Sequence, residues 1–261
     1  MPHPTLHVGC VSYLNSVPLI AGLEQRDPAT RLHLDVPSAL LTGLESGRFD
    51  IALCPVVDLF RSAADLIPIP VGGIACHGPT HTVKLFARQP LADCATVAAD
   101  TDSHTSINLL RVLWPDHSPH TLELIPTDFR DTNLGRLEAD AALLIGDKVI
   151  TAPPPADLYP HTLDLGDAWL RKTGLPFVFA IWMARRTTDL HDLPQTLASL
   201  LDANLANIEP LATRAARDKG WPPDLALRYM TEILHYRITA EDLTAIERFR
   251  DELSAIDRVA V

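Results

Sequence analysis

Hydrophobic and polar positions along the chain follow two alternating spacings. Short apolar runs rich in Val, Ile and Leu, typical of buried parallel strands, are followed by stretches with the 3.6-residue spacing of helices. This order predicts an α/β fold with parallel sheets rather than an all-β sandwich. The first set of elements is predicted as strands at 5–10, 31–35 and 50–54, with helices at 17–24 and 37–46.

A second set repeats this order. Its third strand opens with an Asp in "LGRLEADAAL", as the first set does in "LESGRFDIAL", and Leu precedes Asp50 and Asp140 by six places. The shared letters are few, so chance similarity stays an alternative. The repeated order nevertheless predicts two lobes of one design. The second set is predicted as strands at 95–99, 121–126 and 140–145, with helices at 104–113 and 129–138.

The remaining segments predict how the lobes are joined. "VGGIACHGPTHTVKLFARQPL" has two extended runs around a Gly-Pro turn, and "LPFVFAIWMARR" is a buried strand that returns the chain. The Pro-rich "PPPADLYPHTLDLGDAW" predicts a surface loop, and the stretch after Leu193 is helical by period, with no strand. We therefore expect a discontinuous first lobe that carries the C-terminal helices, formed by 1–85 plus 183–261, and a second lobe formed by 86–182, with crossings near 82–88 and 178–185.

Polar turns follow the first strand of each set. "VSYLNSVPL" places Ser12 to Ser16 before a helix with Pro18 in its first turn, and "TDSHTSIN" precedes the second helix. Helix N-termini carry unpaired N–H groups and favour anions, and ligands of open α/β sheets bind beyond the carboxyl ends of the strands. An anionic ligand in a cleft between the lobes is one interpretation. The alternative is that Ser12, Asn15 or Ser16 only caps the helix.

Other polar side chains near these ends have two interpretations each. His104 is either a proton carrier or an exposed first-turn residue, and Thr105 or Ser106 either binds an anion or serves as an N-cap. Asp147, after the strand in "LLIGDKV", either orients a donor or takes a proton, or it caps the next helix.

Charge and composition narrow the classes of binding partner that the protein is expected to have. The formal charge of −11 repels nucleic acid and anionic lipid surfaces, so an anionic ligand needs local donors. The sequence has no signal-like N-terminal segment and no apolar run of membrane-spanning length, which favours a cytoplasmic protein without membrane contact. The four widely spaced cysteines suit reduced, buried thiols.

The sequence predicts no metal or cofactor. Cys76, His77 and His81 in "CHGPTH" could be taken for a metal site, but Pro79 excludes helical i,i+4 spacing and the segment has no fourth ligand. His77 is better interpreted as a cleft-edge or surface residue. Neither a phosphate loop nor a GxGxxG motif after a strand is present, and no Ser-His-Asp order occurs.

Several blocks resemble one enzyme family. "VSYLNSVPL", "GRFDIAL", "DTDSHTSINLL", "LLIGD", "DLGDAWLRKTGLPFVFAIW" and "YMTEILHYRIT", spread over nearly the whole chain, are similar to the chorismate dehydratases of the futalosine route to menaquinone. The resemblance implies a two-lobed fold like that of type II periplasmic binding proteins. It also implies a carbon-oxygen lyase that dehydrates chorismate, a dicarboxylate, to 3-[(1-carboxyvinyl)oxy]benzoate.

The resemblance also assigns residues. Asn15 of the SYLN block implies a hydrogen-bonding partner of the reacting centre, and Thr82 stands where the family usually has Ser. Cys54-Pro55 replaces a frequent Ser-Ser pair, which leaves the backbone N–H of Val56, beside a Pro suited to a helix start, as a donor. The predicted catalytic residues are Asn15 and Thr82, and the predicted substrate-binding residues are Ser12, Tyr13, Cys54, Pro55, Val56, Ser103, His104, Thr105, Ser106 and Asp147.

Two other functions remain open at this point. Enzymes that make 1,4-dihydroxy-6-naphthoate share the fold but resemble a pattern with His where this chain has Gly146-Asp147. A cytoplasmic module that binds a small carboxylate without chemistry would have the same composition. The expected partner is a small molecule, and the expected assembly is a monomer or homodimer. The general base is not identified, and the enolpyruvyl carboxylate of the substrate is our hypothesis for it.

Overall fold

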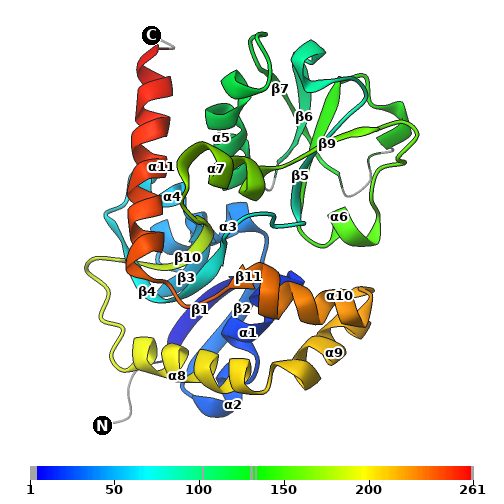
Figure 1. The fold of residues 1–261 in the computed structure, drawn as a ribbon. Helices are drawn as coiled ribbons and strands as arrows, with labels where there is room; N and C mark the ends of the chain where they lie inside the picture. The colour runs from blue at the N-terminus through cyan, green and yellow to red at the C-terminus, as the bar shows by residue number, and fades with distance from the viewer. Residues whose placement is uncertain (1–4, 102, 130–131, 133, 260–261) are drawn as a thin grey trace. The chain divides into compact units, whose positions relative to one another are not determined.

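The computed structural model describes residues 5–101, 103–129, 132 and 134–259. Its contacts divide the chain into two compact units, and each contains a sheet with helices (Figure 1). The mixed α/β fold class is as predicted, and each unit is formed by two separate stretches of the chain. The first unit is formed by Met1–Ala75 and Val178–Ala240, and the second by Cys76–Phe177 and Glu241–Val261.

The division differs from the expected one at the C-terminal helix. Helix α11, Ala240–Val259, lies with the second unit, although 183–261 was expected to belong wholly to the first. The physical reason is an aromatic cluster: Phe249 of α11 contacts Phe177 and Trp169 edge to face, at centroid distances of 5.0 and 5.9 Å. Periodicity identifies the helix but does not show which core it covers.

The first unit is built around a six-stranded sheet in the order β11-β4-β10-β3-β1-β2. Strand β1 lies between β2, at the edge of the sheet, and β3, and it pairs in parallel with both. Apolar side chains of β1 and β3 are buried, as expected for strands covered on both faces. The strands are β1 Leu6–Val11, β2 Thr30–Asp35, β3 Ile51–Pro55, β4 Leu66–Cys76, β10 Phe177–Arg185 and β11 Leu234–His235.

Two helical predictions in this unit need correction. The single helix expected at 17–24 is two short helices, because Gly22 takes a left-handed φ of 82° between them. The C-terminal stretch, expected to lack a strand, contributes β11 beside β4. The helices are α1 Val17–Ile20, α2 Leu23–Arg26, α3 Pro37–Glu45, α4 Asp58–Arg61, α8 Leu193–Ala206, α9 Ile208–Lys219 and α10 Pro223–Arg228, followed by a π-helical turn at Tyr229–Ile233.

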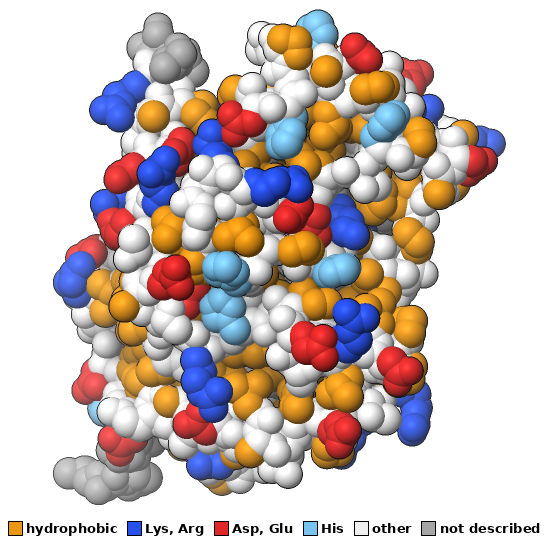
Figure 2. Space-filling model, in the orientation of Figure 1, with side chains coloured by type: hydrophobic (Ala, Val, Ile, Leu, Met, Phe, Trp, Pro, Cys, Tyr) orange, Lys and Arg blue, Asp and Glu red, His pale blue; other side chains and the backbone are white. Residues whose placement is uncertain are grey.

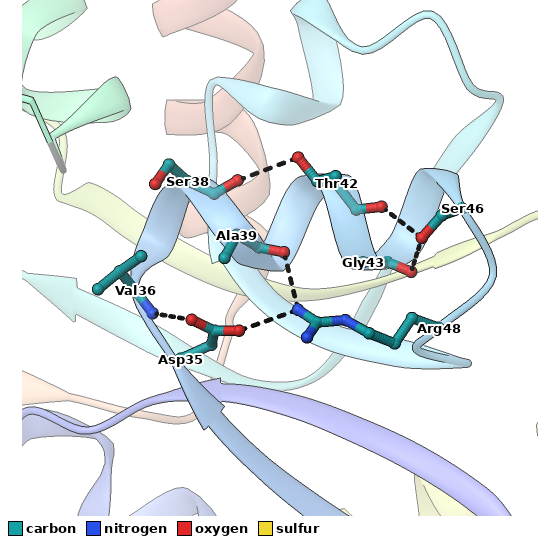
Figure 3. Close-up of polar contacts among 8 residues, drawn as sticks. All are labelled: Asp35, Val36, Ser38, Ala39, Thr42, Gly43, Ser46 and Arg48. Atoms are coloured by element: carbon teal, nitrogen blue, oxygen red, sulfur yellow. Dashed lines mark hydrogen bonds and ion pairs between the residues drawn. The ribbon is translucent and has the colours of Figure 1, made fainter.

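Polar contacts fix α3 to the end of β2 (Figure 3). Arg48 donates to Asp35 Oδ2 at 2.9 Å and to the carbonyl of Ala39 at 3.4 Å, while Val36 N donates to Asp35 Oδ1 at 2.9 Å. The hydrogen bond from Arg48 lowers the pKa of Asp35, and the Val36 N–H adds to this effect. The contacts therefore hold the turn that leads from β2 into the helix.

The second unit has a five-stranded sheet in the order β7-β6-β8-β5-β9. The segment expected to be a surface loop forms β9 and α7, and the helix expected at 129–138 is only a 3-10 turn at Leu134–Arg136, with residues 130, 131 and 133 outside the described part. The elements are β5 Val83–Ala87, β6 Thr96–Asp100, β7 Glu123–Thr127, β8 Ala141–Ile145, β9 His161–Asp164, α5 His104–Leu113, α6 Lys148–Thr151 and α7 Leu165–Thr173, besides α11.

The two sheets confirm the internal repeat. The arrangement β2-β1-β3 in the first unit matches β7-β6-β8 in the second, with all these pairs parallel. The two acidic residues of the repeated motif also make equivalent hydrogen bonds. Asp50 accepts from the N–H of His7 at the start of β1, and Asp140 accepts from the N–H of Thr96 at the start of β6. Each carboxylate thus ties the third strand of a set to its first.

Surface charge is mixed. Figure 2 shows acidic and basic side chains interspersed with apolar ones on the face it presents, without a broad patch of one sign. Among the described residues, no helix is long and apolar enough to span a membrane.

Candidate functional site

The predicted site residues form two groups, one in each unit, and we describe each group by itself. The first comprises Ser12, Tyr13, Asn15 and Cys54 to Val56, and the second comprises Thr82, Ser103 to Ser106 and Asp147. Both lie at carboxyl ends of parallel strands. The expectation that they share one cleft stays a prediction.

In the first unit, the chain leaves β1 through a tight turn. Leu14–Ser16 forms a 3-10 turn that runs into α1, whose second residue is Pro18. The Ser16 hydroxyl oxygen lies 2.8 Å from the carbonyl oxygens of both Val11 and Tyr13, which share its one hydrogen, and it makes no capping bond to α1. The capping interpretation of Ser16 is therefore wrong: its hydroxyl closes the turn.

Asn15 has a different environment from its neighbour. Its side-chain Oδ1 is buried and has no hydrogen-bond partner among the described residues. An unsatisfied buried acceptor costs roughly 1–3 kcal/mol, so such atoms are rare, and a strained contact, an ordered water or a bound ligand accounts for them. Asn15 thus has an acceptor that the described residues leave unused, and its predicted role toward a ligand stays a prediction. Ser12, in contrast, is exposed, and Tyr13 is half-buried.

A lysine that the sequence analysis did not identify lies beside this turn. Lys219, at the end of α9, donates its ammonium to the carbonyl of Ser12. The two residues are 207 positions apart, and no motif links them. The contact places a positive charge next to the Ser12–Ser16 turn in a protein of net charge −11.

The second part of this group, Cys54 to Val56, is held in the sheet of the first unit. Cys54 is fully buried on β3, and burial raises the pKa of its thiol well above the ordinary value, with nearby Asp58 adding to the rise. Pro55 is the last residue of β3 and does not start a helix, since α4 begins at Asp58. Val56 N donates to the carbonyl of Phe179 at 3.0 Å. The proposed Val56 N–H donor is therefore already used by the sheet.

In the second unit, the register brings the predicted residues to one end of the sheet. Strands β6 and β8 run in parallel and end there, and β5 runs the opposite way and starts there. The buried Thr82 precedes β5, and its carbonyl accepts from Gly146 N at 2.9 Å. Thr82, Asp147 and the start of α5 therefore lie at the same end.

The start of α5 is suited to an anion. Ser103 precedes the helix with its side chain 3% exposed, and its Oγ has no partner within the described chain. Its carbonyl accepts the first helical hydrogen bond, from Ile107 N at 3.2 Å, so the N–H groups of His104, Thr105 and Ser106 precede the helical ladder. Thr105 and Ser106 are buried and His104 is half-buried. A buried hydroxyl at a helix N-terminus is a recurrent anion-binding arrangement.

Asp147 does not cap α6 through its side chain. Its carbonyl accepts from Ile150 and Thr151, and its half-buried side chain makes no capping hydrogen bond. Next to it, Lys148 forms an ion pair of 2.5 Å with Asp100, which is 1% exposed. No sequence motif indicates this pair, because the two residues are 48 positions apart.

The "CHGPTH" segment has a structural explanation. Cys76 is buried, donates to the carbonyl of Gly78 at 3.1 Å, and has a pKa raised by burial and by the charge of Asp164. His77 is exposed, and the N–H of His81 is held by Asp164. Within the described ranges, no group of three or more potential metal ligands occurs.

Known proteins show similarity over almost the whole chain. A chorismate dehydratase from Thermus thermophilus is 29% identical over 262 residues, which cover 94% of both chains. Protein AF1704 from Archaeoglobus fulgidus superimposes with a TM-score of 0.72 at 15% identity, covering 96% of this chain and 97% of that one. The alkanesulfonate-binding protein SsuA from Xanthomonas axonopodis pv. citri gives 0.67 at 17% identity, covering 98% and 95%.

These structural likenesses show the fold, which is that of periplasmic binding proteins. The family is given by the sequence. A family model described as menaquinone biosynthesis matches residues 6–255. The chain therefore belongs to this menaquinone biosynthesis family.

Proposed function

We propose that the protein is a carbon-oxygen lyase that dehydrates chorismate to 3-[(1-carboxyvinyl)oxy]benzoate, the first step of the futalosine route. The C3 proton and the C4 hydroxyl of the ring leave as water, and the ring becomes aromatic. Because aromatisation favours the products, the protein mainly has to orient the ring and assist these two departures. The identity to a chorismate dehydratase supports this assignment.

The buried Oδ1 of Asn15, which finds no hydrogen-bond partner in the described part of the chain, is the observation that carries the proposal. In this orientation the amide oxygen accepts a hydrogen bond from a substrate hydroxyl such as that at C4 and fixes its position, while the proton that the departing oxygen gains is the one removed from C3. A preorganised hydrogen-bonding group in a dry site contributes several kcal/mol to a reaction step, far more than the same bond in water.

The substrate carries two carboxylates, and the second unit offers a place for one. We assign it to the start of α5, where the Ser103 hydroxyl lacks a partner among the described residues and the Thr105 and Ser106 side chains are buried. The hydroxyl of Thr82 belongs to the same end of the sheet and contacts the ring in this proposal.

For the general base, we retain the enolpyruvyl carboxylate of the substrate. The Cys54 thiol is unsuitable, because its raised pKa keeps it neutral near pH 7. Asp147 and His104 are the one carboxylate and the one imidazole among the predicted site residues. If Asp147→Asn and His104→Gln each keep turnover within about threefold of the parent, neither serves as the base, since loss of general-base catalysis typically costs 100-fold or more.

The test is incubation of purified protein with chorismate, followed by chromatography and mass spectrometry of the products. We expect loss of water and appearance of the enolpyruvyl-oxy benzoate, with activity retained after exhaustive EDTA treatment. Bound but unchanged chorismate would indicate a binding module instead. Turnover of a cyclic futalosine derivative, with chorismate untouched, would favour the naphthoate synthase alternative.

A further inference from the structure

One carboxylate in the second unit joins two segments that are far apart in the chain. Asp164 ends β9 and precedes α7. Its Oδ1 accepts from Gly166 N at 3.1 Å and Asp167 N at 3.3 Å, which caps the helix. The same Oδ1 accepts from Thr80 N at 2.9 Å, and Oδ2 accepts from His81 N at 2.8 Å. The segment that enters β5 is thus fixed to the start of α7.

The segment held in this way has little freedom. His81 has a φ of 64°, a left-handed conformation that residues with a Cβ seldom adopt without support from their surroundings. The start of α7 also presses closely against it: a Cβ added at Gly166 would lie 2.5 Å from the carbonyl oxygen of Gly78 and 2.7 Å from Cys76 Sγ. The two hydrogen bonds to Asp164 therefore support a strained turn in a tight fit.

Helix α7 is itself anchored in the core. Trp169 is fully buried, donates its indole N–H to the carbonyl of Pro176 at 2.9 Å, and packs edge to face on Phe177 at 5.4 Å. A residue at the start of α7 therefore has a rigid support. Groups that must be placed to within a fraction of an ångström are best carried by such supports.

Thr82 follows this turn directly. Its side chain is 3% exposed, and the backbone conformation at His81 decides where the Thr82 hydroxyl lies. We propose that Asp164 is a positioning residue for the dehydration of chorismate, which acts by holding Thr80 and His81 so that the Thr82 hydroxyl meets the substrate. This inference rests on the proposed function, in which Thr82 contacts the ring.

The first variant is Asp164→Ser. Serine is a good N-cap, so it preserves the start of α7, but its side chain is too short to reach Thr80 and His81 as well. We expect kcat to fall at least about tenfold, since small misplacements of reacting groups cost one to two orders of magnitude, and KM to stay within about threefold. The control is Asp167→Asn in the same helical turn, whose partner Arg171 is exposed and which should behave as the parent.

The second step is a double-mutant cycle with Thr82→Val, which removes the hydroxyl but keeps the shape. If Asp164 acts through that hydroxyl, Asp164→Ser should cost nothing further in the Thr82→Val background, whereas independent effects would multiply. Multiplied effects would overturn the inference. So would amide exchange at residues 80–84 that is unchanged in Asp164→Ser, where we expect it to be about tenfold faster. If the parent leaves chorismate unchanged, the proposed function fails, and the exchange measurement alone decides whether Asp164 holds the turn.

Discussion

At the residue scale, Asn15 and Ser16 are neighbours in one turn whose side chains have opposite roles. The Ser16 hydroxyl shares its one hydrogen between two backbone carbonyls of the turn, and the Asn15 Oδ1 is buried without a partner among the described residues. The Ser16 side chain therefore contributes to the stability of the fold. The Asn15 side chain keeps an unsatisfied acceptor, and its removal should not lower the free energy of unfolding.

This contrast gives a prediction for two alanine variants. Asn15→Ala should lower turnover of chorismate on the order of 100-fold or more while leaving the melting temperature unchanged or slightly higher. Ser16→Ala should lower stability by about 1 kcal/mol, a few degrees in a chain of this size, with turnover near that of the parent. Turnover assays and thermal melts of both variants separate the roles. An Asn15→Ala variant that melts lower but keeps its activity would make Asn15 a structural residue.

At the element scale, apolar spacing predicts strands better than it predicts some helices. Strands β1, β3 and β8 lie within a residue of their predicted bounds, because a run buried on both faces has few alternatives. The prediction of a helix at 129–138 was wrong for a related reason. The side chains of Phe129, Leu134 and Leu137 pack on one core cluster. Their spacing therefore indicates that they are buried, and the described residues of this segment reach that burial with a short 3-10 turn.

Candidate residues show the same limit. The start of α5 was identified because helix chemistry is local in sequence, and Asn15 was identified because the SYLN block resembles a family motif. Lys219 and Asp164 were not, since their partners lie 207 and more than 80 positions away. The prediction that the Val56 N–H serves as a donor to the ligand was wrong for the same reason. Its acceptor, the carbonyl of Phe179, lies on β10, far from Val56 in the sequence.

Asp140, the acidic residue of the second repeat, allows a test of how β8 is joined to β6. Burial acts to raise the pKa of Asp140, but hydrogen bonds from Ala95 N, Thr96 N and the Thr96 hydroxyl outweigh burial and lower it below 3.8. A carboxyl with a lowered folded pKa stabilises the protein above its unfolded pKa, and this contribution is lost as the pH falls through the folded value.

Asp140→Asn should therefore destabilise the second unit at pH 7 by about 1 kcal/mol, because partial exposure weakens the charged hydrogen bonds. The difference from the parent should shrink as the pH is lowered from 5 toward 3. Melting temperatures across this window, with the exposed Asp93→Asn as a control, measure the effect. A difference that stays constant with pH would mean that the carboxylate charge is not what ties β8 to β6.

At the scale of the whole molecule, the chain crosses between its units more often than the apolar pattern predicts. Two crossings were expected, but the division has a third, since the last helix returns to the second unit. Both units are therefore made from distant parts of the sequence. Neither core can be completed before the C-terminal third of the chain is present, because β10 lies inside the first sheet and α11 supplies Phe249 to the second unit.

The assignment of α11 can be tested through Phe249. Its side chain is 1% exposed and lies against Trp169 and Phe177, so Phe249→Ala should cost about 3–5 kcal/mol, most of the stability of a small unit. We expect hydrogen exchange to speed up in peptides covering 83–113 and to stay slow in peptides covering 6–35. The exposed Leu243→Ala on the same helix should change neither region. If protection is lost at 6–35 while 83–113 stays protected, α11 belongs to the first unit, as its position in the sequence suggested.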